Sequence, residues 1–433
     1  MMELIKKLFL SLQSKLGQDL FNTLLVTGAL FTASFFSYLL QFFLGRTLPV
    51  EEFGNFTALL SLVSILTFFG TVVGYSLVKI FSELNSVNQQ GKIKWLFYEI
   101  IKYSTVAGLF LGFICILFSS QIEQALKISG STTIIIFGLY LVFSFVPIYL
   151  AVFFQGVYRL VWFSVFLVGS SLIRLLVPSL FVVLVQPSAS VVYFGLLIGQ
   201  LLTILLGVGI AKFACLQSEN IEKDKAVTSQ LFKDSFFNGL ALLTLTIMIA
   251  IDVIAVKFFF TPYLAGIYSG VVTMGKIIVF GAGAVATVMF PRAVMVKNDY
   301  VGYKNGVTKF FILQIIFVLG SLFFFVAFPE AITHLLFGPR YEESIQYIPL
   351  YSVFVGFYVL INFTILALIA IGEKRFSLFM PLFLIVQCVG FYLFHSDINQ
   401  VLIVNVVSML LLFAFMVFNV VKVIDRLKNE STS

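Results

Sequence analysis

Charged side chains are scarce in this sequence. Lysine, arginine, aspartate and glutamate make up 11% of its 433 residues, and 60% are hydrophobic, whereas a soluble domain carries about 25% charge. Apolar runs of roughly 20 residues, the length that a helix needs to cross a bilayer, recur from end to end. The runs are continuous rather than alternating, which excludes a membrane β-barrel. Because the bilayer then leaves only helices, the sequence predicts an all-α polytopic membrane protein.

Cysteine and histidine are also rare, with three and two residues. Cys115, Cys215 and Cys388 stand far apart, in or beside apolar runs, which is typical of packing residues rather than a disulfide framework or a zinc site. His334 and His395 lack metal-ligand spacing. We also find no catalytic constellation and no soluble segment large enough to hydrolyse ATP. We therefore expect a protein that is not an enzyme, has no cofactor or metal, and draws energy from an ion gradient or the membrane potential.

The net charge of +7 does not indicate a nucleic-acid partner. With the N-terminus inside, nineteen lysines and arginines fall in cytoplasmic segments and only three, Arg46, Lys127 and Arg340, in the opposite loops. Positive residues gather on the cytoplasmic side of membrane proteins. The bias therefore predicts a multi-pass protein of the cytoplasmic membrane with both termini in the cytoplasm.

Twelve spanning helices are predicted from the apolar runs. Pro147 and Pro178 lie inside two of them and predict kinks or local opening. The predicted spans are 21–44, 55–80, 97–118, 132–154, 163–186, 191–214, 236–260, 264–290, 309–328, 347–371, 377–395 and 400–421.

The most polar internal segment, 215–235, divides these spans into six and six. We expect an N-terminal lobe over 20–214, a cytoplasmic linker at 215–235, a C-terminal lobe over 236–421 and a cytoplasmic tail at 422–433. In residues 1–19, apolar side chains recur at helical spacing among lysines. This pattern predicts an amphipathic helix on the anionic cytoplasmic face rather than a cleaved signal.

A short internal repeat supports the division into halves. After Pro49 the chain reads GNF at 54–56, and after Pro262 it reads GIY at 266–268, 212 residues later. In both halves a glycine followed at +2 by an aromatic opens the second helix. Transporters are often built from such repeats, with the substrate site between them.

Lys276 and Asp252 are charges deep inside predicted spans. Lys276 stands about 12 residues into its span, roughly 18 Å along the axis, and Asp252 about 12 Å from the end of its own. An ionisable group at such depth faces a cavity or a partner rather than lipid. We expect Lys276 to line a substrate cavity or to pair with Asp252, and Asp252 to pair or to carry a coupling H⁺ or Na⁺.

Three further cations are candidates for the same cavity. Arg174 lies in the middle of its predicted span, one turn before Pro178. Lys257 is one turn from a span end, where its stem could also snorkel to the interface. Arg46, at the end of the first span, is a candidate for the cavity rim. A cationic cavity suits an anionic substrate, because a diphosphate in a low-dielectric path needs compensating positive charge.

Five segments of the chain carry a family resemblance. They are LGRTLPVEEFGNFTALLSLVSIL (44–66), FQGVYRLVWFSV (154–165), Asp252 to Lys276 with AGIY at 265–268, VMFPRAV (288–294) and HLLFGPRYEES (334–344). Their order along nearly the whole chain resembles polysaccharide flippases of the multidrug/oligosaccharidyl-lipid/polysaccharide exporter (MOP) superfamily.

The resemblance implies a MATE-like fold, with two six-helix lobes around a central cavity that work by alternating access. The implied substrate is a polyprenyl-diphosphate-linked oligosaccharide, and twelve spans rather than fourteen favour the capsule, O-antigen or exopolysaccharide branch. Implied partners are membrane lipids, a polysaccharide polymerase and glycosyltransferases. In one departure, the first span, 21–44, has no charge, whereas related flippases place arginines there.

Two other functions stay open at this point. A multidrug or small-cation antiporter of the same superfamily would have an acidic cavity, whereas the deep charges here are three cations against Asp252. A membrane glycan polymerase or ligase would use a sizeable outer loop, and the longest one predicted is 329–346.

Overall fold

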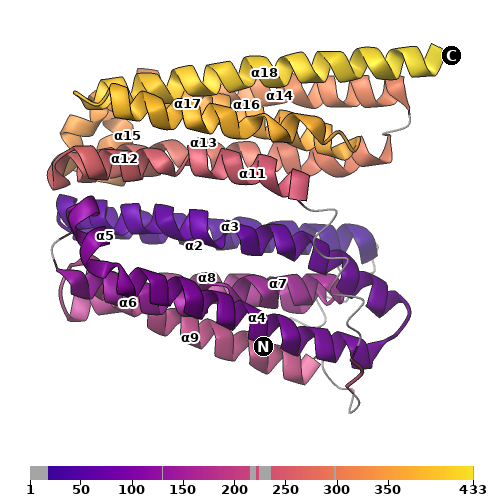
Figure 1. Ribbon diagram of the computed structural model, residues 1–433, viewed down its shortest axis with the longest axis horizontal. Helices are drawn as coiled ribbons and strands as arrows, with labels where there is room; N and C mark the ends of the chain where they lie inside the picture. The colour runs from indigo at the N-terminus through magenta and orange to yellow at the C-terminus, as the bar shows by residue number, and fades with distance from the viewer. Residues whose placement is uncertain (1–17, 129, 215–220, 224–235, 297–298, 433) are drawn as a thin grey trace. The chain divides into compact units, whose positions relative to one another are not determined.

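The computed structural model describes residues 18–128, 130–214, 221–223, 236–296 and 299–432, and within these ranges every regular element is a helix (Figure 1). The expected amphipathic helix at 1–19 and the linker at 215–235 lie almost wholly outside the described residues. In chain order the helices are α2 (Gln18–Thr47), α3 (Val50–Ser86), α4 (Gln90–Leu117), α5 (Ser119–Leu126), α6 (Ser131–Ser144), α7 (Val146–Gly156), α8 (Leu160–Leu184), α9 (Ala189–Ala214), α11 (Phe236–Met248), α12 (Ile251–Phe259), α13 (Pro262–Met295), α14 (Tyr300–Ala327), α15 (Pro329–Leu336), the 3₁₀-helix η2 (Pro339–Tyr347), α16 (Ile348–Ala370), the 3₁₀-helix η3 (Arg375–Leu378), α17 (Met380–Leu393) and α18 (Ile398–Thr432).

Twelve helical segments of the described chain are long and apolar enough to cross a membrane, which confirms the predicted number and the all-α class. Two of the predicted spans consist of two helices each, α6 with α7 and α11 with α12. The short helices α5 and α15 lie outside the spans.

The break between α6 and α7 confirms the effect predicted for Pro147. A proline has no backbone N–H, so the carbonyl of Phe143, four residues earlier, loses its helical donor. The side-chain amide of Gln200 on α9 donates to that carbonyl instead, at 3.2 Å. At Pro178, by contrast, α8 continues as one helix through the proline.

The chain forms two compact units. Among the described residues, unit 1 holds those of 1–43, 70–119 and 132–232, and unit 2 holds those of 44–69, 120–131 and 233–433. The turn between α2 and α3, and the helix α5, are therefore part of unit 2 although they precede the polar segment in sequence.

The core of unit 1 is aromatic. The ring of Phe153 on α7 lies 5.3 Å from that of Phe81 on α3 and 4.6 Å from that of Phe97 on α4, centroid to centroid. In a bilayer, apolar side chains gain little by leaving lipid, so close packing holds helices together. Small residues permit it: a Cβ on Gly195 of α9 would lie 2.5 Å from the Cα of Pro178 on α8.

Unit 2 is built around α13, α14 and α16. The rings of Phe311 on α14 and Phe363 on α16 are 5.6 Å apart. On the same two helices, the hydroxyl of Tyr303 donates to the carbonyl of Ala367 at 2.9 Å. Direct hydrogen bonds between helices thus supplement the apolar packing in this unit.

The two glycines of the internal repeat meet in unit 2. A Cβ on Gly54 of α3 would lie 2.9 Å from the backbone nitrogen of Gly266 on α13. Beside them, the ring of Phe53 packs 5.5 Å from Phe337 and 6.2 Å from Tyr341, centroid to centroid. Only glycine allows two backbones to approach so closely, which explains why both hairpins carry it.

Candidate functional site

The span that carries Asp252 is broken. Helix α11 ends at Met248 and α12 begins at Ile251, although the intervening Ile249 and Ala250 include neither proline nor glycine. The carbonyl of Met248 accepts a hydrogen bond of 3.0 Å from the side-chain amide of Gln387 on α17. Since an unpaired carbonyl in lipid costs several kcal/mol, this side chain supplies what the interrupted helix lacks.

Asp252 lies in the first turn of α12, directly after the break, and is fully buried. Its Oδ1 accepts from the backbone N–H of Val253 at 2.7 Å. The N-terminus of a helix favours negative charge because its free N–H groups point outward along the axis. The break therefore creates, inside a span, a place where a carboxylate is stabilised.

A chain of buried polar side chains continues from Asp252 across unit 2. The hydroxyl of Tyr268 on α13 donates to Oδ2 of Asp252 at 2.7 Å and accepts from Nδ2 of Asn405 on α18 at 3.3 Å. Oδ1 of Asn405 accepts from Nε2 of Gln387 at 2.7 Å. Four helices thus contribute one residue each to a network, which we call the polar network: Asp252, Tyr268, Asn405 and Gln387.

One acceptor of the polar network makes no hydrogen bond within the described part of the chain. Within the described part of the chain, Oε1 of Gln387 is buried and has no hydrogen-bond partner. Carboxylate, hydroxyl and amide oxygens are the ligands that hard cations prefer. No group of three or more histidine, cysteine, aspartate or glutamate residues that could hold a metal is found among the described residues.

Lys276 is two turns beyond Tyr268 on α13 and is half-buried. Its ammonium and the Asp252 carboxylate are close enough to interact electrostatically. This interaction is consistent with the pairing with Asp252 that the sequence left open for Lys276, and the role of Lys276 as a cavity cation stays a prediction.

Lys257, on the last turn of α12, is completely buried, and its Nζ has no hydrogen-bond partner in the described part of the chain. Its strongest charge interaction is with Glu52 on α3. Nearby, Nζ of Lys127 donates to the carbonyls of Phe259 and Phe260, at 3.3 and 2.8 Å, at the end of α12. One end of α12 therefore holds a desolvated ammonium that is attracted by a carboxylate on another helix.

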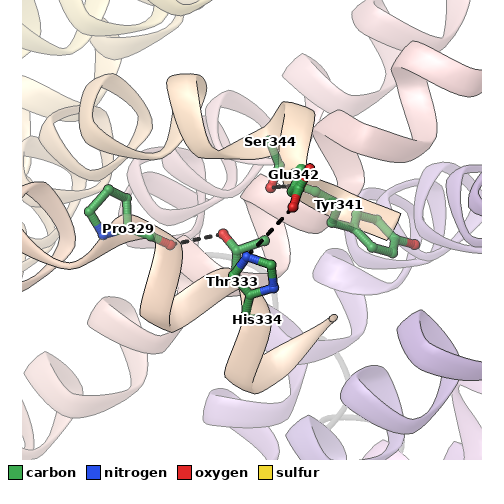
Figure 2. Close-up of polar contacts among 6 residues, drawn as sticks. All are labelled: Pro329, Thr333, His334, Tyr341, Glu342 and Ser344. Carbon is green, nitrogen blue, oxygen red and sulfur yellow. Dashed lines mark hydrogen bonds and ion pairs between the residues drawn. The ribbon is translucent and has the colours of Figure 1, made fainter. Parts of the chain in front are cut away.

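Arg46 donates to the carbonyls of residues 334, 335 and 336 at the end of α15, the first and last at 3.5 and 3.0 Å. Its own carbonyl accepts from Arg340 at 2.7 Å. Figure 2 shows the same region: Thr333 bonds back to Pro329 within α15, and His334 lies 3.9 Å from Glu342 of η2. The guanidinium of Arg46 thus caps a helix C-terminus, where the orphan carbonyls attract cations.

Arg174 belongs to unit 1, whereas the other four predicted site residues belong to unit 2. Its side chain is exposed, and Nη2 donates to the hydroxyl of Tyr140 on α6 at 3.0 Å. The Tyr140 ring packs edge-on against Tyr193, with centroids 5.8 Å apart. Two tyrosines therefore hold the arginine in place while part of it stays accessible.

The sequence reasoning missed three of the four residues of the polar network. Gln387 and Asn405 are amides inside predicted apolar spans, and polar groups at such positions are expensive and usually functional. That signal was present and would have found them. Tyr268 appeared only as the aromatic of the internal repeat, and nothing local marks its hydroxyl as a partner of Asp252.

The fold is that of known transporters. The chain is similar to an inward-facing multidrug resistance MATE family transporter of the MOP superfamily, with a TM-score of 0.75 and 12% identity over 90% of this chain and 95% of that one. It is similar to the lipid II flippase MurJ in an inward closed conformation (TM-score 0.72, 13% identity, 94% and 91% covered). It is also similar to the eukaryotic MATE transporter AtDTX14 (TM-score 0.67, 13% identity, 98% and 99% covered). These likenesses define the class of fold, a MATE-like bundle of apolar helices.

The family follows from the sequence. The profile of the polysaccharide biosynthesis protein family matches residues 20–297, more than half of the chain, and the chain belongs to that family. No curated protein matches the chain.

Proposed function

We propose that this protein is a flippase of the cytoplasmic membrane that moves a polyprenyl-diphosphate-linked oligosaccharide to the outer leaflet for surface polysaccharide biosynthesis. Membership of the polysaccharide biosynthesis protein family and the MOP-superfamily fold support the proposal. A polysaccharide polymerase and glycosyltransferases are its proposed partners, and capsule, O-antigen or exopolysaccharide its proposed pathway class. The chemistry is movement of a lipid across the membrane, not catalysis.

The observation that carries the mechanism is the buried carboxylate of Asp252, which accepts a hydrogen bond from Tyr268 in the polar network and attracts the charge of Lys276. An ammonium group at this depth can neutralise either Asp252 or a diphosphate. When a proton or Na⁺ neutralises Asp252, the carboxylate attracts Lys276 less strongly. The Lys276 ammonium is then available to the diphosphate. Binding of the cation and binding of the substrate are thereby linked, and each affects the other by the same free energy.

The other predicted cations have supporting roles in this proposal. Lys257 contributes a second desolvated ammonium in unit 2, and Arg174, held by Tyr140, contributes cationic charge from the first half of the chain. Arg46, whose guanidinium caps the end of α15, is the proposed rim residue.

Replacement of Lys276 tests the proposal. We expect Lys276→Ala to reduce surface glycan at least about thirtyfold, because removing one charge partner at a buried phosphate contact costs about 2–5 kcal/mol. Lys276→Arg should retain part of the activity. Lys304→Ala, which removes an exposed lysine of α14, is the matched control. Surface glycan is measured in cells that carry each variant at equal membrane abundance, and wild-type levels in Lys276→Ala would contradict the proposal.

A cation-coupled antiporter of small molecules is the second candidate, favoured by the buried carboxylate Asp252. The same cells separate the two functions. In the flippase, loss of the chain removes surface glycan and leaves resistance to cationic drugs unchanged. In the antiporter the reverse holds.

A further inference from the structure

Helices α13 and α14 pack side by side as an antiparallel pair (Figure 1). Residues of both helices line two hollows. The first hollow has a volume of about 400 Å³ and includes Arg292, Asn305, Lys309 and Phe310 in its lining. The second has a volume of about 630 Å³ and is lined by apolar and small residues of α13, α14 and α15, among them Gly320. We call them the basic hollow and the apolar hollow.

The two hollows lie on one face of α14. Their lining includes Gly306, Lys309 and Leu313 in the basic hollow and Ile316 and Gly320 in the apolar one. These positions are three or four residues apart, and side chains at that spacing share a helix face. Leu313 and Ile316 are consecutive on this face, so one hollow follows the other without a gap of a full turn.

The charge of this seam changes from one end to the other. All lining residues of the two hollows lie in the described part of the chain, and the only charged ones are Arg292 and Lys309 in the basic hollow. The guanidinium carbon of Arg292 lies 5.9 Å above the ring of Phe310, which helps to hold it at the hollow. Asp299 packs against Gly302 at the edge of the basic hollow but is not part of its lining.

The length of α14 from Lys309 in the basic hollow to Gly320 in the apolar hollow fits one leaflet of a bilayer. Half of a hydrocarbon core of about 30 Å is about 15 Å, which corresponds to about ten residues of helix. Ten residues from Lys309 end beside Gly320, inside the apolar hollow. A lipid with its head at Lys309 would therefore place its chain end in the apolar hollow.

We propose that this face of α13 and α14 binds one anionic phospholipid of the surrounding bilayer. Its phosphate lies between Arg292 and Lys309, and one acyl chain follows the seam into the apolar hollow. Basic pockets between spanning helices bind anionic lipid head groups, and the charged end here lies next to a groove that only an apolar chain can fill. This site is separate from the polar network and does not depend on the proposed flippase activity.

The proposed phosphate contact with Arg292 and Lys309 is tested by binding phosphatidylglycerol to the purified full-length protein in neutral detergent. Native mass spectrometry measures the binding, and the thermal unfolding midpoint measures the stabilisation. We expect binding and stabilisation by phosphatidylglycerol, but not by phosphatidylcholine with the same chains or by inorganic phosphate. In Arg292→Gln/Lys309→Gln the affinity should fall roughly thirtyfold, since each cation near a membrane surface contributes about fivefold. The control Lys304→Gln/Arg375→Gln removes one lysine and one arginine elsewhere in unit 2 and should bind as the wild type does.

The proposed acyl-chain site in the apolar hollow is tested with Gly320→Leu. A Cβ on Gly320 meets nothing within 4 Å, so the new side chain enters the apolar hollow without displacing protein atoms. Phosphatidylglycerol binding should fall at least fivefold, whereas Gly209→Leu, at an equally open glycine of α9, should leave it unchanged.

Charge-conserving exchange, Arg292→Lys/Lys309→Arg, should restore binding and guards against a folding defect in the glutamine variant. The proposal is overturned if inorganic phosphate or phosphatidylcholine stabilises as well as phosphatidylglycerol does. It is also overturned if the glutamine pair or Gly320→Leu binds like the wild type.

Discussion

Tyr268 is the residue on which the polar network depends most. Its hydroxyl donates to Asp252 and accepts from Asn405, so one atom joins three helices. Both neighbours are fully buried and neither can turn to water. Inside lipid, hydrogen bonds between helices contribute about 0.6–1.7 kcal/mol each, so the network contributes to the stability of unit 2.

Tyr268→Phe should therefore lower the stability of the protein and, under the proposed function, its export of glycan. It removes two hydrogen bonds and leaves Oδ2 of Asp252 and Nδ2 of Asn405 buried without the hydroxyl, at a cost of about 1–3 kcal/mol. We expect a lower thermal unfolding midpoint and a loss of surface glycan. Tyr303→Phe is the control, because it removes a single bond to the Ala367 carbonyl in the same unit. If both variants lose the same stability and keep export, the network is purely structural.

Lys257 differs from Tyr268 because its burial is expected to lower the stability of the protein. A buried ammonium without a hydrogen-bond partner destabilises a fold, and apolar replacement of such charges is often neutral or stabilising. Lys257→Met should thus unfold at or above the wild-type temperature yet export less glycan, because in the proposed mechanism this charge serves the substrate. A midpoint well below that of the wild type would show instead that the interaction with Glu52 holds α3 to α12.

At the scale of elements, the two interrupted spans have different causes. The α6–α7 break follows from Pro147, whereas no proline or glycine accompanies the α11–α12 break. In both, a glutamine from another helix donates to the carbonyl at the end of the first segment, Gln200 to Phe143 and Gln387 to Met248. The second break is the one that places Asp252 at a helix N-terminus.

Gln387→Leu and Gln200→Leu form a matched pair for that comparison. Each removes one donor to an orphan carbonyl, and each should cost about 1–2 kcal/mol in thermal stability. Only Gln387→Leu should abolish export, since it also detaches Asn405 from the network. Equal export in the two variants would show that the α11–α12 break has no role in transport.

For the whole molecule, orientation is the property that the charge bias predicts. Single cysteines at Gln186 and Lys428, in a chain whose native cysteines are replaced, report it directly. Both side chains are exposed. A membrane-impermeant maleimide should label Gln186→Cys in intact cells and Lys428→Cys only after permeabilisation, because the positive-inside bias puts the C-terminus in the cytoplasm. Labelling of Lys428→Cys in intact cells would reverse the proposed topology.

The division into halves also belongs to this scale. The expected lobes at 20–214 and 236–421 remain a proposal. Within unit 2, the segment 44–69 from the first half of the sequence packs on α13 through Gly54 and Gly266. The repeat that marks the two hairpins in sequence therefore also marks where their backbones touch.

Composition and local pattern by themselves determined the twelve helical spans, the break at Pro147 and the deep charges Asp252, Lys257 and Lys276. These are consequences of short-range chemistry: apolar runs must be helical in lipid, and a proline cannot donate its N–H. Only the tertiary structure decided the α11–α12 break and the polar network. The reason is that Met248 and Gln387 are 139 residues apart and Tyr268 and Asn405 are 137 apart, so no local pattern encodes which carbonyl or hydroxyl each will meet.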